Sequence, residues 1–152
     1  MRLTSIAALA AALACGPSFA ADGAAVFKQV CAAFLVAGGV GAPGLAPALN
    51  GSLAAKAGAD PVRAYMTQVV VHGLSGKIVV DGIGYTGAMP AQAQLSDDDL
   101  AAVLTHVVQD LAAQKAVPAF QPGDLAAARA QKPAPKDLRA LRETALANAA
   151  AR

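Results

Sequence analysis

Apolar side chains recur at helical spacing near the start of the chain. Positions i, i+3, i+4 and i+7 of one stretch are all apolar: Phe27, Val30, Cys31 and Phe34. This spacing puts the four residues on one face of a helix. We therefore expect Phe34 to extend the buried stripe of that helix.

Two further helices are predicted together with their boundaries. One has Asp60 as its expected N-cap and Pro61 at the first helical position, and it ends at Gly73. The other has Ser96 as its N-cap, followed by three aspartates in the first turn, where the helix dipole favours negative charge. Its apolar residues keep helical spacing: Leu100, Val103, Leu104, Val107, Val108 and Leu111.

The remaining segments are a short β-prone run and a basic tail. The run Lys77–Asp81 is a candidate hairpin strand, and a glycine-spaced loop follows it and presents Met89. After Pro118 the chain becomes basic and proline-interrupted, and residues 136–150 read as a weakly amphipathic helix. We expect the tail, residues 119–152, to pack loosely or not at all and to be dispensable for folding.

The first twenty residues predict export. A short apolar run is followed by Ser18 and Ala20, which fit the small positions of a secretory cleavage site, so residues 1–20 read as a signal peptide. The predicted location is the periplasm. In an alternative interpretation, Cys15 is the lipid-bearing residue of an anchored lipoprotein. Simple cleavage leaves Cys31 as the single cysteine, which excludes a disulfide framework.

The order of motifs resembles the class I cytochrome c family. It is carried by Cys31 at the start of the stretch CAAFL, a Gly/Pro-rich loop over 38–49, the segment ending in Met89-Pro90, and the helix capped by Ser96. The resemblance covers about 21–118 and implies one all-α domain, a small cytochrome c-like helical bundle with a C-terminal extension. In that family the last helix packs across the first. The implied function is that of a periplasmic electron carrier, or of the cytochrome subunit of a membrane-bound dehydrogenase or oxidase, with a redox partner protein.

The resemblance also implies haem c, with Cys31 as one thioether and Met89 as an axial iron ligand. The family motif has a second cysteine and a histidine where this chain has Phe34 and Leu35, and neither can form a thioether or ligate iron. We therefore predict that haem attachment is lost or non-native in this chain. Natural divergence, an engineered replacement and a sequence error are all open as origins of Phe34-Leu35-Val36. The alternative function is a haem-free structural or docking subunit.

Other chemistry has little support in the sequence. We expect structural roles for the two histidines, with His72 at a helix end and His106 exposed. A copper site built from these histidines, Cys31 and Met89 is a third, minor hypothesis. No spacing indicates a nucleophile with its base, so no enzyme is predicted, and no nucleic-acid footprint is present. Peripheral association of the basic tail with a membrane stays open.

Overall fold

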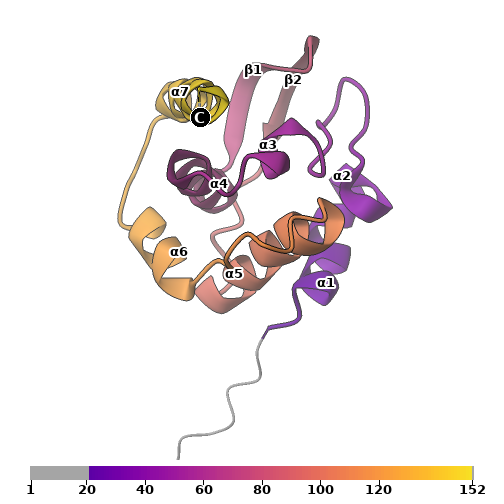
Figure 1. Ribbon diagram of the computed structural model, residues 1–152, viewed down its shortest axis with the longest axis vertical. Helices are drawn as coiled ribbons and strands as arrows, with labels where there is room; N and C mark the ends of the chain where they lie inside the picture. Colours follow the sequence, from indigo (N-terminus) through magenta and orange to yellow (C-terminus); the bar gives the residue numbers. More distant parts are fainter. Residues whose placement is uncertain (1–20, 152) are drawn as a thin grey trace, which may run out of the picture.

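The computed structural model describes residues 21–151, apart from the side chain of Ala37. The predicted signal peptide and Cys15 lie outside the described residues. Helices dominate, with one two-stranded sheet (Figure 1), which confirms the predicted helical fold class. In chain order the elements are α1 Gly23–Val26, η1 Phe27–Cys31, α2 Ala32–Leu35, η2 Ala37–Gly39, α3 Ser52–Ala55, α4 Asp60–His72, β1 Leu74–Val80, β2 Ile83–Met89, α5 Asp97–His106, η3 Val107–Leu111, α6 Pro122–Arg129 and α7 Pro135–Ala150.

The two long helices predicted from capping signals are present. In α5 the Ser96 side chain accepts a hydrogen bond of 3.1 Å from the Asp99 backbone N–H, as predicted. Helix α4 ends before Gly73, whose φ of 74° is open to glycine but costly for other residues. One detail was wrong: Ala59 is the N-cap of α4, and Asp60 lies in the first turn, where its charge still complements the dipole.

The first and last helices of the predicted domain cross at very short range. A Cβ atom added to Gly23 in α1 would lie 2.2 Å from the carbonyl oxygen of Ala102 in α5. Only a residue without a side chain lets the two backbones approach this closely. The packing of the Ser96-capped helix across the first helix is thus confirmed.

The β-prone run is one half of a hairpin longer than the sequence predicts. Strands β1 and β2 pair antiparallel from Leu74↔Met89 to Val80↔Ile83. Asp81 and Gly82 join them, both with positive φ, the conformation of a two-residue hairpin turn. The segment expected to be a glycine-spaced loop is therefore mostly strand, and Met89 is the last residue of β2.

The expectation of a loosely packed tail is wrong. Helices α6 and α7 both pack on α4, and α6 also packs on α5 (Figure 1). Their buried residues belong to the core of the molecule: Phe120, Leu125, Ala128, Leu138 and Ala145. Alanine-rich faces bury little area per residue, but they let helices approach closely enough to fill the core at native density.

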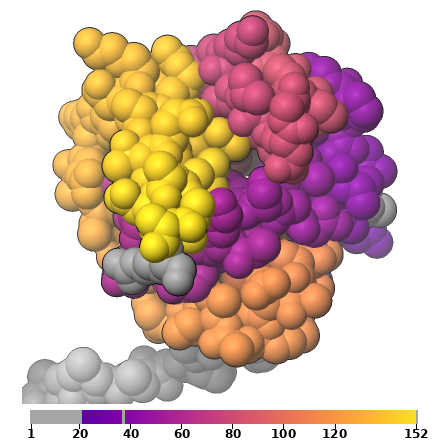
Figure 2. All heavy atoms as spheres, turned by 45° about the horizontal axis from the view of Figure 1, so that its top comes forward, coloured from indigo at the N-terminus to yellow at the C-terminus, as the bar shows by residue number. Residues whose placement is uncertain are grey.

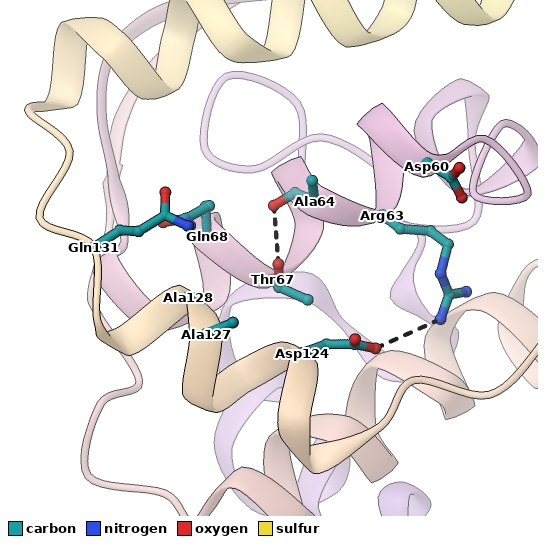
Figure 3. A pocket seen from close by; sticks show the side chains of 9 residues that line it. All are labelled: Asp60, Arg63, Ala64, Thr67, Gln68, Asp124, Ala127, Ala128 and Gln131. Atoms are coloured by element: carbon teal, nitrogen blue, oxygen red, sulfur yellow. Dashed lines mark hydrogen bonds and ion pairs between the residues drawn. The ribbon is translucent and has the colours of Figure 1, made fainter.

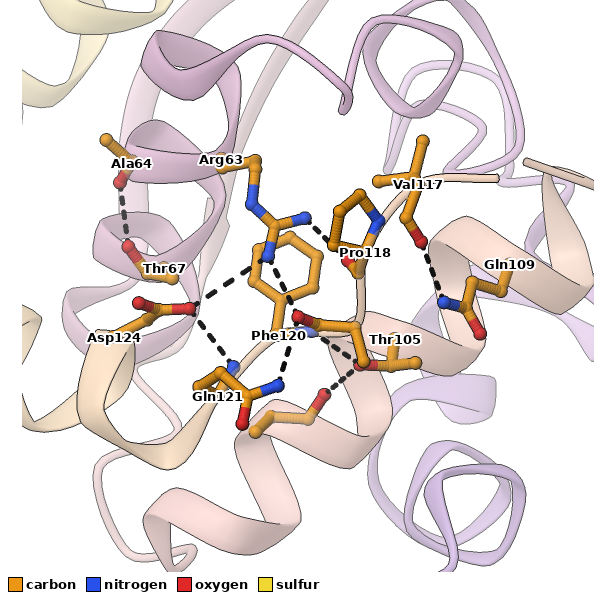
Figure 4. Close-up of polar contacts among 12 residues, drawn as sticks. Arg63, Ala64, Thr67, Thr105, Gln109, Val117, Pro118, Phe120, Gln121 and Asp124 are labelled. Atoms are coloured by element: carbon orange, nitrogen blue, oxygen red, sulfur yellow. Dashed lines mark hydrogen bonds and ion pairs between the residues drawn. The ribbon is translucent and has the colours of Figure 1, made fainter. Parts of the chain in front are cut away.

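Arg63 of α4 fixes the start of the tail. Its guanidinium donates hydrogen bonds to the carbonyl oxygens of Pro118 and Ala119, at 2.8 and 3.1 Å, and lies 4.0 Å from the centre of the Phe120 ring (Figure 4). The Phe120 backbone N–H donates to the Thr105 hydroxyl at 2.9 Å. The chain after Pro118 is therefore held to both α4 and α5.

Two arginines of the tail reach back to earlier elements. Arg129 pairs with Asp97 at 2.6 Å and donates to the carbonyl oxygen of Ala93 at 2.7 Å, in the segment that joins β2 to α5. Arg139 of α7 donates to the Ser75 carbonyl oxygen of β1, and a Cβ on the adjacent Gly76 would lie 2.7 Å from its guanidinium. The tail thus contacts both sides of the segment that carries Met89.

Candidate functional site

Cys31 lies at the end of η1 with its side chain half-buried. It packs at the margin of the core, and it is the one cysteine among the described residues. Burial raises the pKa of the Cys31 thiol because the thiolate would lose solvation. At neutral pH the group is therefore a protonated thiol rather than a nucleophile.

We expect Cys31 to react slowly with iodoacetamide. The rate at pH 8 should be below that of a cysteine in a model peptide, and the rate's midpoint with pH should lie above the ordinary thiol pKa. Stopped alkylation followed by intact mass measures this rate. The same chain in 8 M urea is the control, and it should react like the peptide. Equal rates with and without urea would contradict the buried position of Cys31.

Phe34 does not extend the apolar stripe as predicted. Its side chain is 50% exposed, whereas the next residue, Leu35, packs against the core. The cause lies in η1, where the chain makes a π turn at Phe27–Cys31. This wider turn adds one residue to the helical repeat, so the face that Phe27 begins continues at i+8 rather than at i+7.

Val36, which follows the two replaced motif positions, has a strained backbone. Its φ is 58°, a region that β-branched residues rarely adopt and glycine adopts freely. The backbone at this position is thus shaped for glycine although the sequence has valine. The misfit lies within the same three residues, Phe34-Leu35-Val36, that depart from the family motif.

Replacing this valine should stabilise the protein. We expect Val36→Gly to raise the free energy of unfolding by about 1 kcal/mol, because strain at an unfavourable φ costs about 1–3 kcal/mol and glycine's greater unfolded-state entropy cancels part of the gain. Urea unfolding of both proteins gives the difference. Val40→Gly is the matched control, since Val40 is also exposed but has a φ of −73°, and it should give no gain. A loss of stability in Val36→Gly would refute the strain.

Met89 is also accessible, with 39% of its surface exposed at the end of β2. It lies on a different segment from Cys31. No group of three or more His, Cys, Asp or Glu side chains that could hold a metal ion occurs within residues 21–151. The copper hypothesis therefore finds no site among them.

Large exposed apolar side chains gather on two segments, and we call them the apolar patch. Phe34 to Leu45 supplies four members and the hairpin supplies three: Phe34, Val36, Val40, Leu45, Val79, Ile83 and Met89. The segments meet, because a Cβ on Gly87 would lie 3.2 Å from the Leu45 carbonyl oxygen. Figure 2 shows the hairpin, in pink, against the purple segment around residue 40. An apolar patch on otherwise polar surface typically marks a binding site.

Both histidines have structural partners. The His72 Nε2–H donates to the carbonyl oxygen of Ala128 at 2.9 Å, which holds α4 to α6. His106 was expected to be exposed, but only 16% of its side chain is accessible. It bonds to Asp110 at 2.7 Å and lies against the Phe27 ring, which explains its burial. Hydrogen bonds from Lys115 and His106 lower the pKa of Asp110.

The donor atoms in this region do not match those of an ordinary haem c. Covalent attachment with His/Met ligation needs two thiols, an imidazole and a thioether. Residues 21–151 supply one thiol at Cys31 and one thioether at Met89, and the imidazoles of His72 and His106 are bonded elsewhere. The apolar patch is suited to a flat apolar surface, but the residues that would attach and ligate a haem are incomplete.

The comparisons with known proteins agree with the order of motifs. No protein-family model matches the chain. Cytochrome c-552 of Thermus thermophilus is 39% identical over 102 residues, which are 67% of this chain and 77% of that protein. A second cytochrome c-552, from a named strain of Thermus thermophilus, is also 39% identical over 102 residues, 68% of its length. The chain belongs to the cytochrome c family.

Proposed function

We propose that this chain serves an exported electron-transfer system as a docking or structural subunit without a covalent haem c. The replacement of the second cysteine and of the histidine by Phe34 and Leu35 carries the proposal. Membership of the cytochrome c family supports the setting, and the apolar patch supplies a surface for a redox partner. No enzymatic activity is part of the proposal. Export rests on residues 1–20, and no helix within 21–151 is long and apolar enough to cross a membrane.

A second candidate is an electron carrier that still binds haem through what remains of the site. The accessible thioether of Met89 and the thiol of Cys31 favour it, as does the cytochrome c-552 name of the relatives. A methionine thioether alone is a weak ligand for iron when no imidazole binds opposite. We therefore place this function second.

Expression of the full chain with the cytochrome maturation machinery separates the two. We expect the purified protein to show the mass of the processed polypeptide with no haem increment and no Soret absorbance. The Cys31→Ser variant, which has no thiol, should give the same spectrum. A stoichiometric haem adduct in the unmodified chain, absent from Cys31→Ser, would establish the electron-carrier function instead.

The docking role has its own test. Charged substitutions in the hairpin, Val79→Lys with Ile83→Lys, should leave the fold intact because both side chains are about half exposed. They should abolish co-purification of a haem-containing redox protein from the native periplasm. The matched control is Lys77→Glu with Thr86→Lys, which changes charges at exposed hairpin positions outside the patch. Equal recovery with every variant would contradict docking through the apolar patch.

A further inference from the structure

A groove between α4 and α6 lies apart from Cys31, Met89 and the apolar patch. Its volume is about 290 Å³, close to the lower limit for small-molecule sites. Polar residues of α4, of α6 and of the segment after α6 line it: Asp60, Arg63, Thr67, Gln68, Asp124 and Gln131. Figure 3 shows that the carboxylates lie toward one end of the groove and the two glutamine amides lie toward the other.

Gln68 carries an unpaired acceptor into this groove. The residue is only 6% exposed, and its Oε1 atom is buried without a hydrogen-bond partner among the described residues. Leaving a buried acceptor unpaired costs about 1–3 kcal/mol, so such groups in folded proteins are normally satisfied by water or by a ligand. The Gln131 side chain extends toward Gln68 in Figure 3, but no hydrogen bond joins it to Oε1.

The other free polar atoms of the groove are mostly acceptors as well. The Thr67 hydroxyl donates to the Ala64 carbonyl oxygen, so only its lone pairs remain. The Asp60 side chain supplies a further carboxylate at the rim. The donors of Arg63 are turned to Pro118 and Ala119, and its guanidinium is 3.9 Å from Asp124. The groove therefore favours a ligand rich in hydrogen-bond donors.

We propose that this groove binds a linear aliphatic amine. An ammonium group donates to Gln68 Oε1 at the buried end, and the methylene chain lies along the alanines of the wall, Ala64, Ala127 and Ala128. Residues 60 and 68 are eight positions apart in α4, which is about 12 Å along the axis. A diamine can thus place its second ammonium near the carboxylates of Asp60 and Asp124. A bare metal ion does not fit, because no metal-holding cluster exists there among the described residues.

Nuclear magnetic resonance of the chain from Ala21 tests the proposal with 1,4-diaminobutane as the probe. We expect saturable shifts of backbone amides in 64–68 and 124–131. Gln68→Met keeps the shape of the side chain but removes the acceptor, and it should weaken binding about tenfold, the equivalent of one hydrogen bond to a charged donor. Asp60→Asn, at an exposed position, should weaken binding about threefold. Gln29→Met, an exposed glutamine in η1, is the matched control and should not change it.

Tetramethylammonium is the control probe, because it has the charge of an amine and no N–H donor. We expect it to leave these amides unshifted. Equal shifts with both cations would mean general attraction to the carboxylates, and unchanged affinity in Gln68→Met would mean that water alone satisfies Oε1. Either result overturns the proposal. If Gln68→Met does not fold, Asp60→Asn and the comparison of the two cations still decide.

Discussion

Truncation after Pro118 should abolish cooperative folding. The removed segment contributes Phe120, Leu125 and Leu138 to the core, each less than 5% exposed. Burial of a large apolar side chain stabilises a protein by about 1.5–3 kcal/mol, so these three residues together approach the whole stability of a typical domain, about 5–15 kcal/mol. The truncated chain also exposes the apolar face of α4. Circular dichroism during thermal melting should show a broad, non-cooperative transition.

A point substitution separates lost packing from lost chain length. Leu125→Ala in the full chain should lower the free energy of unfolding by about 2–5 kcal/mol, because the side chain is fully buried. Leu45→Ala, at a residue 58% exposed, is the control and should cost much less. A sharp melt of the truncated protein near the original temperature would restore the view of the tail as an accessory segment.

Restoring the two missing groups should restore covalent haem. In Phe34→Cys with Leu35→His, the chain regains the second thiol and an imidazole beside Cys31, and Met89 is accessible on β2. Expressed with the maturation machinery, the double variant should gain the mass of one haem and a Soret band. The exposed position of Phe34 means that its replacement removes little core packing.

Two further variants test the ligands in the restored background. Phe34→Cys alone supplies the second thioether without the imidazole, and it should show no low-spin His/Met spectrum. Met89→Ala added to the double variant should lower the reduction potential, because it removes the axial thioether. A folded double variant that takes up no haem would show that the family's positions do not carry over to this chain.

Local signals predicted the long helices, and tertiary contacts decided what was missed. Ser96 and Gly73 act within one turn of the backbone, so the start of α5 and the end of α4 are legible in the sequence. The π turn of η1 adds a residue to the repeat without changing any residue type, so the apolar spacing of Phe34 gave the wrong face. The tail was missed because its buried surface is mostly alanine, which gives little contrast between faces.

The candidate site was predictable only in its components. The resemblance to cytochrome c picked out Cys31 and Met89, and it identified Phe34 and Leu35 as departures. The apolar patch depends on how the hairpin meets the segment before α3, which no local pattern encodes. Gln68 gave no signal at all, since an amide within a helix becomes notable only when packing leaves its oxygen unpaired.

The hydrogen bond from Arg139 to the Ser75 carbonyl oxygen implies an order of events during synthesis of the chain. The hairpin and Met89 are complete about 50 residues before the arginine that holds them is made. At about 5–20 residues per second, synthesis leaves β1 and β2 without that support for roughly 3–10 seconds. During this interval the apolar side chains of the hairpin are open to chaperones and to any factor that acts on the unfinished chain.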